Sequence, residues 1–212
     1  LLTLLNCFSG CMALLSLFEN NYEKTLMWVL IGVFLDSFDG LVARAFRATT
    51  EIGKQLDSLC DVISFGVVPG YFMYKYLSDF LSYELVPLSL SAFVVTLASI
   101  FRLARFNITP SSQLDFQGLP TPAFALFVIG IPFIPYEINP IIITVIVALL
   151  TVLMVSKIML PSQKFVNGKP SNFFWIFAVV AIPVLLIFRS QALSLTVLTY
   201  AFFGMLYMRL RA

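Results

Sequence analysis

Long apolar runs, separated by short polar connections, dominate the pattern of residues along the chain. Several runs approach or exceed the roughly 17–25 residues that a helix needs to cross a bilayer. We expect eight spans, and the fifth is interrupted by Pro132 and Pro135. The expected spans cover residues 1–18, 25–46, 55–78, 85–107, 121–136, 139–160, 172–189 and 192–209. The pattern therefore predicts an all-α protein, a polytopic membrane bundle of about eight transmembrane helices.

The composition agrees with a location in the membrane. Of the 212 residues, 60% are hydrophobic and 11% are charged, whereas soluble domains carry about 25% charged residues. The chain has no His, which excludes His-based acid–base chemistry and leaves carboxylates for metal or proton chemistry. Cys7, Cys11 and Cys60 lack the spacing of a disulfide framework or a metal site, so we interpret them as small apolar helix residues.

The basic residues predict how the spans are oriented. If the N-terminus is cytoplasmic, all Lys and Arg residues except Lys24, Lys75 and Arg189 fall on the cytoplasmic side. Cytoplasmic loops are enriched in these residue types, so this arrangement is favoured over its inverse. The sequence therefore predicts a multi-pass protein of the cell (cytoplasmic) membrane with both termini inside.

Four aspartates lie within or beside the second and third apolar runs. Asp36 and Asp39 are three residues apart and Asp57 and Asp61 are four apart, so each pair shares a helix face. The connection between the two helices is short, which makes them antiparallel neighbours whose carboxylates converge near the cytoplasmic surface. A carboxylate is costly on the lipid face, so we expect all four to point into the bundle.

Four converging carboxylates repel one another, and a divalent cation relieves that repulsion. Mg²⁺ prefers carboxylate and water oxygens and often bridges to phosphates. Two such ions can clamp a phosphoryl group, while a carboxylate accepts the proton of an attacking hydroxyl. The cluster therefore indicates phosphoryl transfer at a membrane surface. Helix packing with intramembrane ion pairs, or a proton path, is the alternative interpretation.

Small residues accompany the aspartates. Gly40, Ala43 and Gly53 allow a neighbouring helix or a bulky nucleotide to approach closely. Helix packing alone is the commoner reason for such residues. Arg44 offers a guanidinium fork that suits a diphosphate. These positions are therefore candidates for a nucleotide pocket beside the carboxylates.

The aspartates and small residues follow one continuous pattern. This pattern is Asp36-x2-Asp39-Gly40-x2-Ala43-Arg44-x8-Gly53-x3-Asp57-x3-Asp61. It resembles the full signature of the CDP-alcohol phosphotransferase family. The resemblance implies an integral-membrane enzyme in which an alcohol displaces CMP from a CDP-linked donor.

The resemblance also assigns roles to single residues. It implies that the four aspartates hold two Mg²⁺ or Mn²⁺ ions and that Asp61 is also the general base. It implies a pocket for CDP-diacylglycerol, shaped by Gly40, Ala43, Arg44, Thr50 and Gly53. It further implies a homodimer and a six-span core over residues 1–160, which leaves residues 161–212 as a two-helix C-terminal extension of the same membrane domain.

Polar residues near the end of the fourth span bear on the identity of the alcohol. The segment FRLARFN contains Arg102, Arg105 and Asn107, and its two arginines share a helix face. An Arg fork suits a carboxylate or a phosphate, although arginines at a cytoplasmic helix end also follow from the charge rule alone. L-serine carries a carboxylate and inositol does not, so we interpret these residues as a serine-binding group.

Three segments resemble one branch of the family, the integral-membrane phosphatidylserine synthases. They are RLARFN, GLPTPA and the opening LTLLNCFSG, in which the resemblance places Thr3 and Asn6 at the CDP-diacylglycerol site. We therefore expect an enzyme of the bilayer that joins CDP-diacylglycerol to L-serine, with the active site on the cytoplasmic side and no nucleic acid partner. Glycerol 3-phosphate and inositol phosphate stay open as alternative acceptors. A carboxylate-lined transporter is the alternative from another class.

Overall fold

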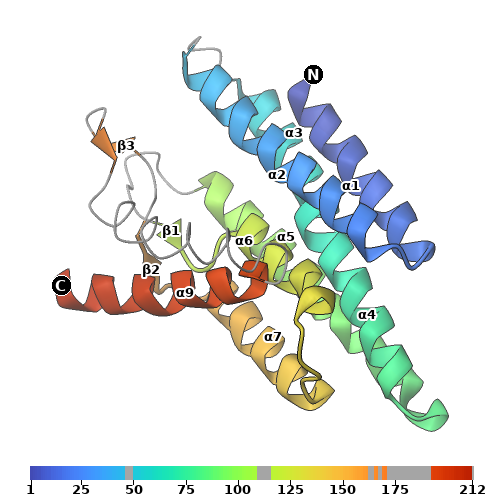
Figure 1. Cartoon of the computed structure of the whole chain (residues 1–212). Helices are drawn as coiled ribbons and strands as arrows, with labels where there is room; N and C mark the ends of the chain where they lie inside the picture. The colour runs from blue at the N-terminus through green and yellow to red at the C-terminus, as the bar shows by residue number, and fades with distance from the viewer. Residues whose placement is uncertain (46–49, 109–115, 162–164, 167–168, 171–191, 212) are drawn as a thin grey trace. The chain divides into compact units, whose positions relative to one another are not determined.

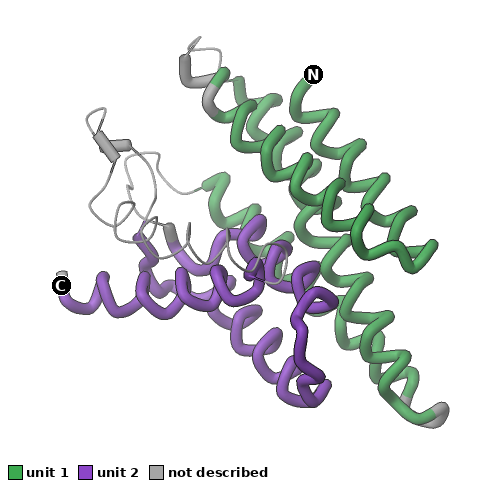
Figure 2. Tube along the Cα trace, viewed as in Figure 1, with its two compact units in different colours: residues 1–108 green, residues 109–212 purple. Residues whose placement is uncertain are grey.

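The computed structural model describes residues 1–45, 50–108, 116–161, 165–166, 169–170 and 192–211 (Figure 1). The chain separates into two compact units, residues 1–108 and residues 109–212 (Figure 2). The two units meet near residue 108, whereas the sequence placed a boundary near residue 160 between a six-span family core and a C-terminal extension. That core and extension stay a prediction.

Unit 1 consists of helices. Its elements are α1 (Leu2–Phe18), α2 (Tyr22–Ala45), α3 (Glu51–Asp61), the π-helical turn η1 (Val62–Val67), α4 (Val68–Phe80), the 3-10 segment η2 (Tyr83–Phe93) and α5 (Val94–Ile108). Helix α1 packs against α2, α3, η1 and α4, and α5 packs against α3, η1 and α4. The continuous segment α3–η1–α4 is therefore the centre of the unit.

The connection between α1 and α2 is a tight turn made by two asparagines. Asn20 adopts a positive φ of 58°, a conformation that Asn tolerates better than most residues. Asn21 then caps α2, because its Oδ1 accepts a hydrogen bond of 3.0 Å from the Lys24 backbone N–H. The short turn makes α1 and α2 antiparallel neighbours, as Figure 1 shows.

Close approach at a glycine sets the distance between α1 and the centre of unit 1. A Cβ on Gly10 would lie 2.9 Å from the Cα of Ser64 in η1, which is too close for any side chain. Gly10 therefore allows α1 to lie directly on the backbone that follows Asp61. Small residues have this effect wherever membrane helices pack tightly.

Unit 2 combines helices with two very short antiparallel strand pairs. Its described helical elements are α6 (Thr121–Gly130), the 3-10 turn η3 (Ile131–Phe133), α7 (Pro140–Val155) and α9 (Ala192–Arg211). Strand β1 (Phe116–Gln117) pairs with β2 (Met159–Leu160), and β3 (Phe165–Val166) pairs with β4 (Lys169–Pro170). The sequence predicted loops at β1, β3 and β4, since strands of two residues carry no periodic signal. It placed Met159 and Leu160 in the span 139–160, whereas α7 ends at Val155 and these two residues form β2.

Helices α6, α7 and α9 are joined by specific contacts. Ser194 Oγ on α9 donates a hydrogen bond of 2.8 Å to the Phe127 carbonyl on α6. Tyr200 OH, also on α9, donates one of 3.1 Å to the Pro161 carbonyl. Gly118 lies before α6 with φ of +70°, where a Cβ would be 2.8 Å from the Leu153 carbonyl oxygen. That close contact requires glycine at the turn.

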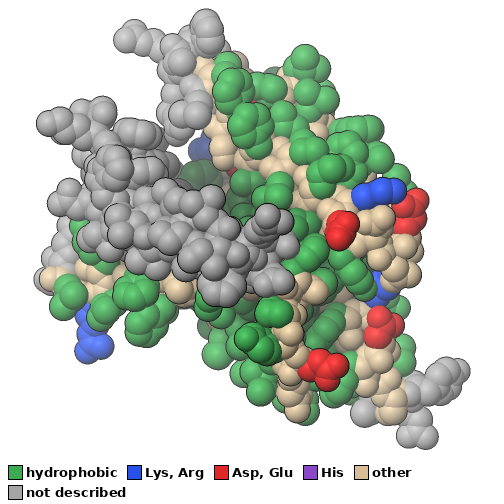
Figure 3. Space-filling view, viewed as in Figure 1, with side chains coloured by type: hydrophobic (Ala, Val, Ile, Leu, Met, Phe, Trp, Pro, Cys, Tyr) green, Lys and Arg blue, Asp and Glu red, His purple; other side chains and the backbone are tan. Residues whose placement is uncertain are grey.

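Three helical segments of the described chain are long and apolar enough to cross a membrane: Glu51–Phe80, Val86–Ile108 and Ala192–Leu210. Three shorter apolar helices are Leu2–Phe18, Thr121–Phe133 and Pro140–Val155. Hydrophobic side chains also cover much of the visible surface (Figure 3), and several of them are more than half exposed, for example Phe34, Leu97 and Leu149. Such exposure fits contact with lipid rather than water. The chain is therefore a helical membrane protein.

The finer membrane predictions go beyond these observations. The predicted span 172–189 lies outside the described residues, so the count of eight spans stays a prediction, as does the cytoplasmic orientation. The cysteines fit their interpretation as ordinary helix residues: Cys7, Cys11 and Cys60 are free thiols on α1 and α3.

Candidate metal centre

Two neighbouring helices of unit 1 carry the four aspartates. Asp36 and Asp39 belong to α2, and Asp57 and Asp61 to α3. Helix α3 begins at Thr50, whose Oγ1 accepts a hydrogen bond of 3.0 Å from the Gly53 backbone N–H. This N-cap satisfies an otherwise unpaired helix donor and fixes where α3 starts.

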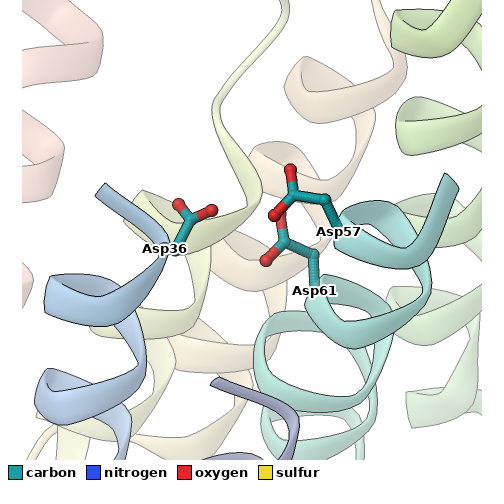
Figure 4. Close-up of side chains that lie close together, drawn as sticks. All are labelled: Asp36, Asp57 and Asp61. Carbon is teal, nitrogen blue, oxygen red and sulfur yellow. The ribbon is translucent and has the colours of Figure 1, made fainter. Parts of the chain in front are cut away.

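Three of the four aspartates converge. Asp36, Asp57 and Asp61 can each offer a carboxylate oxygen such that all three atoms lie within 4.8 Å of one another. Figure 4 shows Asp57 and Asp61 on successive turns of α3, with Asp36 facing them from α2. Asp61 is 7% exposed, and the other two carboxylates are partly buried. The sequence spacing thus brings acids from two helices to one place.

The donor set of this cluster fits a hard divalent cation. Ligand oxygens lie about 2.0–2.1 Å from Mg²⁺, so two oxygens on opposite sides of the ion are about 4 Å apart. The three carboxylate oxygens lie within 4.8 Å of one another. Without a cation, partly buried carboxylates at this distance repel one another. The three aspartates can therefore serve as ligands of one metal ion.

Asp39 lies beside the cluster rather than in it. Its Oδ2 accepts a hydrogen bond from Thr3 Oγ1 on α1. It is nevertheless within electrostatic range of Asp36 and Asp57. The structure thus brings three of the predicted metal ligands together and holds the fourth next to them through α1.

Helix α1 reaches the cluster at a second point. Asn6 Nδ2 donates a hydrogen bond of 2.9 Å to Asp61 Oδ1, and the Asn6 side chain is fully buried. The resemblance predicts Thr3 and Asn6 as contacts of CDP-diacylglycerol, whereas in the structure both side chains contact aspartates. A single sequence gives no signal for these pairs, since their partners lie 36 and 55 positions away.

The backbone changes its winding directly after Asp61. In η1, the Val68 N–H bonds to the Ile63 carbonyl, a π-helical spacing of five residues. Pro69 follows and has no N–H to continue the regular pattern. Thr96 Oγ1 on α5 donates a hydrogen bond of 3.0 Å to the Gly66 carbonyl. Such π-helical turns occur frequently at functional sites, and no residue pattern in the sequence predicted this one.

The predicted nucleotide residues surround the start of α3 and the end of α2. Thr50 and Gly53 form the N-cap, and a Cβ on Gly53 would lie 2.9 Å from Thr50 Oγ1. Gly40 is exposed on α2. Ala43 and Arg44 belong to α2 as well, but their side chains lie outside the part of the structure that is described. A nucleotide role for these five residues stays a prediction.

The two arginines predicted to bind serine occupy different environments on α5. Arg102 is 6% exposed and lies within electrostatic range of Asp61. Arg105, one turn later, is partly exposed, with its Cζ 5.9 Å from the centroid of the Phe101 ring. A buried guanidinium near a carboxylate cluster can bind an anionic group. The structure therefore brings Arg102 close to the aspartates.

Asn107 joins the end of α5 to α3. Its Oδ1 accepts a hydrogen bond of 3.1 Å from Ser58 Oγ, and its Nδ2 donates one of 3.4 Å to Gln55 Oε1. Its backbone carbonyl accepts a hydrogen bond from Lys54 Nζ. These contacts hold α5 against the helix that carries Asp57, a structural link that the sequence did not indicate.

Comparison with known proteins agrees with these features. The sequence model of the CDP-alcohol phosphatidyltransferase family matches residues 1–156. The CDP-diacylglycerol--serine O-phosphatidyltransferase of Bacillus subtilis (strain 168) is 32% identical over 164 residues, which cover 77% of this chain and 89% of that protein. The protein of the same name from Methanocaldococcus jannaschii is 34% identical over 206 residues, 96% of this chain and 90% of that protein.

A third relative carries a different name. The archaetidylserine synthase of Methanothermobacter thermautotrophicus is 36% identical over 128 residues, which cover 59% of this chain and 53% of that protein. The family match covers most of the chain, and it includes all of unit 1 with its aspartate cluster. The chain belongs to the CDP-alcohol phosphatidyltransferase family.

Proposed function

We propose that this chain transfers a phosphatidyl group from CDP-diacylglycerol to the hydroxyl of L-serine, giving phosphatidylserine and CMP. The convergence of Asp36, Asp57 and Asp61 carries the proposal, because it gives a membrane helix bundle the ligands for a cation at a phosphoryl group. Membership of the family supplies the reaction class, and relatives named for serine supply the acceptor.

The aspartates hold the metal in this proposal. Asp36, Asp57 and Asp61 are the ligands, and Asp39, which lies beside them, joins them at a second ion. When bound, Mg²⁺ or Mn²⁺ neutralises the donor diphosphate and stabilises the charge that develops during displacement. In this proposal the nucleotide lies between α2 and the start of α3, near Gly40 and Gly53.

Asp61 is the general base. It accepts the proton of the serine hydroxyl while the hydroxyl oxygen bonds to the phosphorus that carries the lipid. The bond from that phosphorus to CMP breaks, so CMP leaves and phosphatidylserine remains in the membrane. Burial of Asp61 keeps bulk water away from the reacting atoms, and water would otherwise compete with serine for the phosphorus.

Arg102 binds the serine carboxylate. Its guanidinium is buried and lies near Asp61, so a serine held at Arg102 presents its hydroxyl toward the base. A charge-assisted Arg–carboxylate pair gives both strength and orientation. Arg105 and Asn107 complete this end of the site, with Asn107 holding α5 against α3.

Two phosphorylated alcohols are the alternatives to serine as the acceptor. The phosphates of glycerol 3-phosphate and inositol phosphate also suit Arg102, so the arginine alone does not decide. Two relatives of one name and a third named archaetidylserine synthase nevertheless share serine in their names. We therefore place serine first. The site lies on the cytoplasmic side of the cell membrane, where most basic residues are expected, and the enzyme is a homodimer, as the family resemblance implies.

One assay tests the proposal. Purified protein is incubated with CDP-diacylglycerol, Mn²⁺ or Mg²⁺, and one of L-serine, glycerol 3-phosphate or inositol phosphate, and CMP release is measured. We expect CMP release that depends on both the ion and serine, with phosphatidylserine as the lipid product. Faster release with a phosphorylated alcohol would replace the acceptor, and no release with any of the three would contradict the proposed reaction.

A further inference from the structure

Helix α1 presents three residues of one face to the helices of the metal centre. Thr3, Asn6 and Gly10 are separated by three and four positions, the spacing of a single helix face. Thr3 contacts Asp39 on α2, Asn6 contacts Asp61 on α3, and Gly10 lies against Ser64 in η1. One face of α1 thus touches both helices that supply the aspartates and the turn that follows them.

The Asn6 side chain is committed to Asp61. Its Nδ2 donates to Asp61 Oδ1 at 2.9 Å, while its own Oδ1 is buried and accepts no hydrogen bond within the described part of the chain. The reverse orientation of the amide would direct its oxygen at the carboxylate oxygen, which is repulsive. The hydrogen bond to Asp61 therefore determines how this amide is placed.

The backbone of Asn6 is held in place as well. Its carbonyl oxygen accepts hydrogen bonds from Ser64 Oγ at 2.9 Å and from Ser9 Oγ at 2.7 Å. Ser64 belongs to η1, three residues after Asp61. Asn6 is consequently tied to α3 through its side chain and to η1 through its backbone, which fixes the distance between the amide and the carboxylate.

We infer that Asn6 is a positioning residue for the metal centre: it holds the Asp61 carboxylate in the orientation that binds the cation. Groups that hydrogen-bond a metal ligand fix its orientation, and removing such a group weakens metal binding about 10–100-fold. The inference deepens the proposed function and rests on its metal site. It differs from the resemblance-based role of Asn6, a contact with CDP-diacylglycerol.

The two roles of Asn6 predict different results when no donor is present. A positioning residue affects cation binding by the protein alone, because the carboxylate it orients is a ligand. A residue that only contacts the donor leaves that binding unchanged and alters the KM for CDP-diacylglycerol. Mn²⁺ binding without substrate is therefore the informative readout, and Mn²⁺ is measurable directly by electron paramagnetic resonance.

The test uses two substitutions and a matched control. Asn6→Leu keeps a branched side chain of similar size and removes the donor, whereas Asn6→Ala also leaves a cavity. Ser16→Ala removes a buried hydroxyl from the same helix, far from the cluster, where the Ser16 hydroxyl donates to the Met12 carbonyl. Each protein is purified, checked for folding by circular dichroism and gel filtration, and titrated with Mn²⁺.

We expect both Asn6 variants to bind Mn²⁺ about 10–100-fold more weakly than the wild type and Ser16→Ala to bind it normally. Normal Mn²⁺ affinity in a folded Asn6→Leu protein, with a raised KM for CDP-diacylglycerol, would overturn the inference and restore the donor contact. Absence of Mn²⁺ binding by the wild type would instead contradict the metal site itself, so the two failures are distinguishable. If Asn6→Leu does not fold, the same measurements on Asn6→Ala decide. If neither variant folds, Asn6 is required for folding and the inference is overturned.

Discussion

The two compact units are both built from apolar helices, yet polar side chains join those helices in different ways. In unit 1, hydroxyl-to-carbonyl bonds such as that from Thr96 to Gly66 occur together with bonds between side chains. Asn6 on α1 donates to Asp61 on α3, and Ser58 on α3 donates to Asn107 on α5. The acceptors include a carboxylate of the metal centre. Such a contact orients a group that can also bind a ligand.

In the described part of unit 2, two hydroxyl groups of α9 bond to backbone carbonyls. Ser194 and Tyr200 on α9 donate to the carbonyls of Phe127 and Pro161. A carbonyl tied in this way joins two segments but orients no reactive group. Among the described contacts, those of Asn6 and Ser58 reach residues at the site in unit 1, whereas those of Ser194 and Tyr200 join packed segments in unit 2. Substitutions that destabilise the two units equally should therefore lower catalysis more in unit 1 than in unit 2.

The largest expected effect comes from Asp61→Asn, which keeps the shape of the side chain and removes its basicity. Turnover should fall about 10²–10⁴-fold, the usual contribution of a general base. CMP release gives kcat, and retention of labelled CDP-diacylglycerol shows whether the donor still binds. Asp79→Asn, an exposed aspartate on α4, is the matched control and should remain fully active. Near-normal turnover by Asp61→Asn would show that Asp61 is not the general base.

The next effect concerns the acceptor. Arg102→Ala should raise the KM for serine about 10–100-fold, the loss expected for a hydrogen bond to a charged group, and should change the KM for CDP-diacylglycerol much less. Arg105→Ala provides the comparison: its partly exposed guanidinium lies beside Phe101, and we expect a smaller change. Equal increases in both KM values for Arg102→Ala would place that arginine on the donor phosphates instead.

A pair of glycines compares the units directly. A Cβ on Gly10 would meet Ser64 Cα at 2.9 Å in unit 1, and a Cβ on Gly130 would meet Ser194 N at 3.1 Å in unit 2. Each change to alanine should cost about 1–3 kcal/mol of stability through overpacking, measured by thermal unfolding in detergent. Only Gly10→Ala should also weaken Mn²⁺ binding, because Ser64 follows Asp61 closely. Equal loss of Mn²⁺ affinity in Gly130→Ala would break the comparison.

The smallest effects come from single hydrogen bonds. Tyr200→Phe and Ser58→Ala each remove one, and each should cost about 0.5–1.5 kcal/mol. Ser58 lies next to Asp57 and bonds to Asn107, so its loss should also lower the rate of CMP release. Tyr200→Phe should leave that rate unchanged. A slower Tyr200→Phe enzyme with normal Ser58→Ala activity would reverse the roles assigned to the two units.

Part of this site could be predicted from local spacing alone. Acids three or four residues apart share a helix face, and a short connection makes two helices neighbours, so the approach of Asp36, Asp57 and Asp61 followed from the sequence. The membrane helices followed from apolar run length. Both inferences use contacts that are close in sequence or fixed by one short turn.

The remaining features depend on contacts between distant segments. The spacing of Asp39 matches that of the other acids, yet Thr3 on α1 binds it and it lies beside the cluster. The link from Asn107 to Ser58 spans 49 positions. The π-helical turn after Asp61 reflects Pro69 and packing against Gly10 and Thr96. No residue pattern encodes these pairings, since each requires knowing which helices are adjacent.

The central claim is that the aspartate cluster of unit 1 binds the cation on which serine-dependent CMP release relies. The most direct test titrates metal-free protein with Mn²⁺ and measures binding and CMP release in the same samples, for the wild type and for Asp36→Asn. We predict that the Mn²⁺-binding curve and the CMP-release curve coincide in the wild type. Both should move to higher Mn²⁺ concentration in Asp36→Asn. Serine-dependent CMP release at full rate from metal-free protein, or unchanged curves in Asp36→Asn, would contradict the claim.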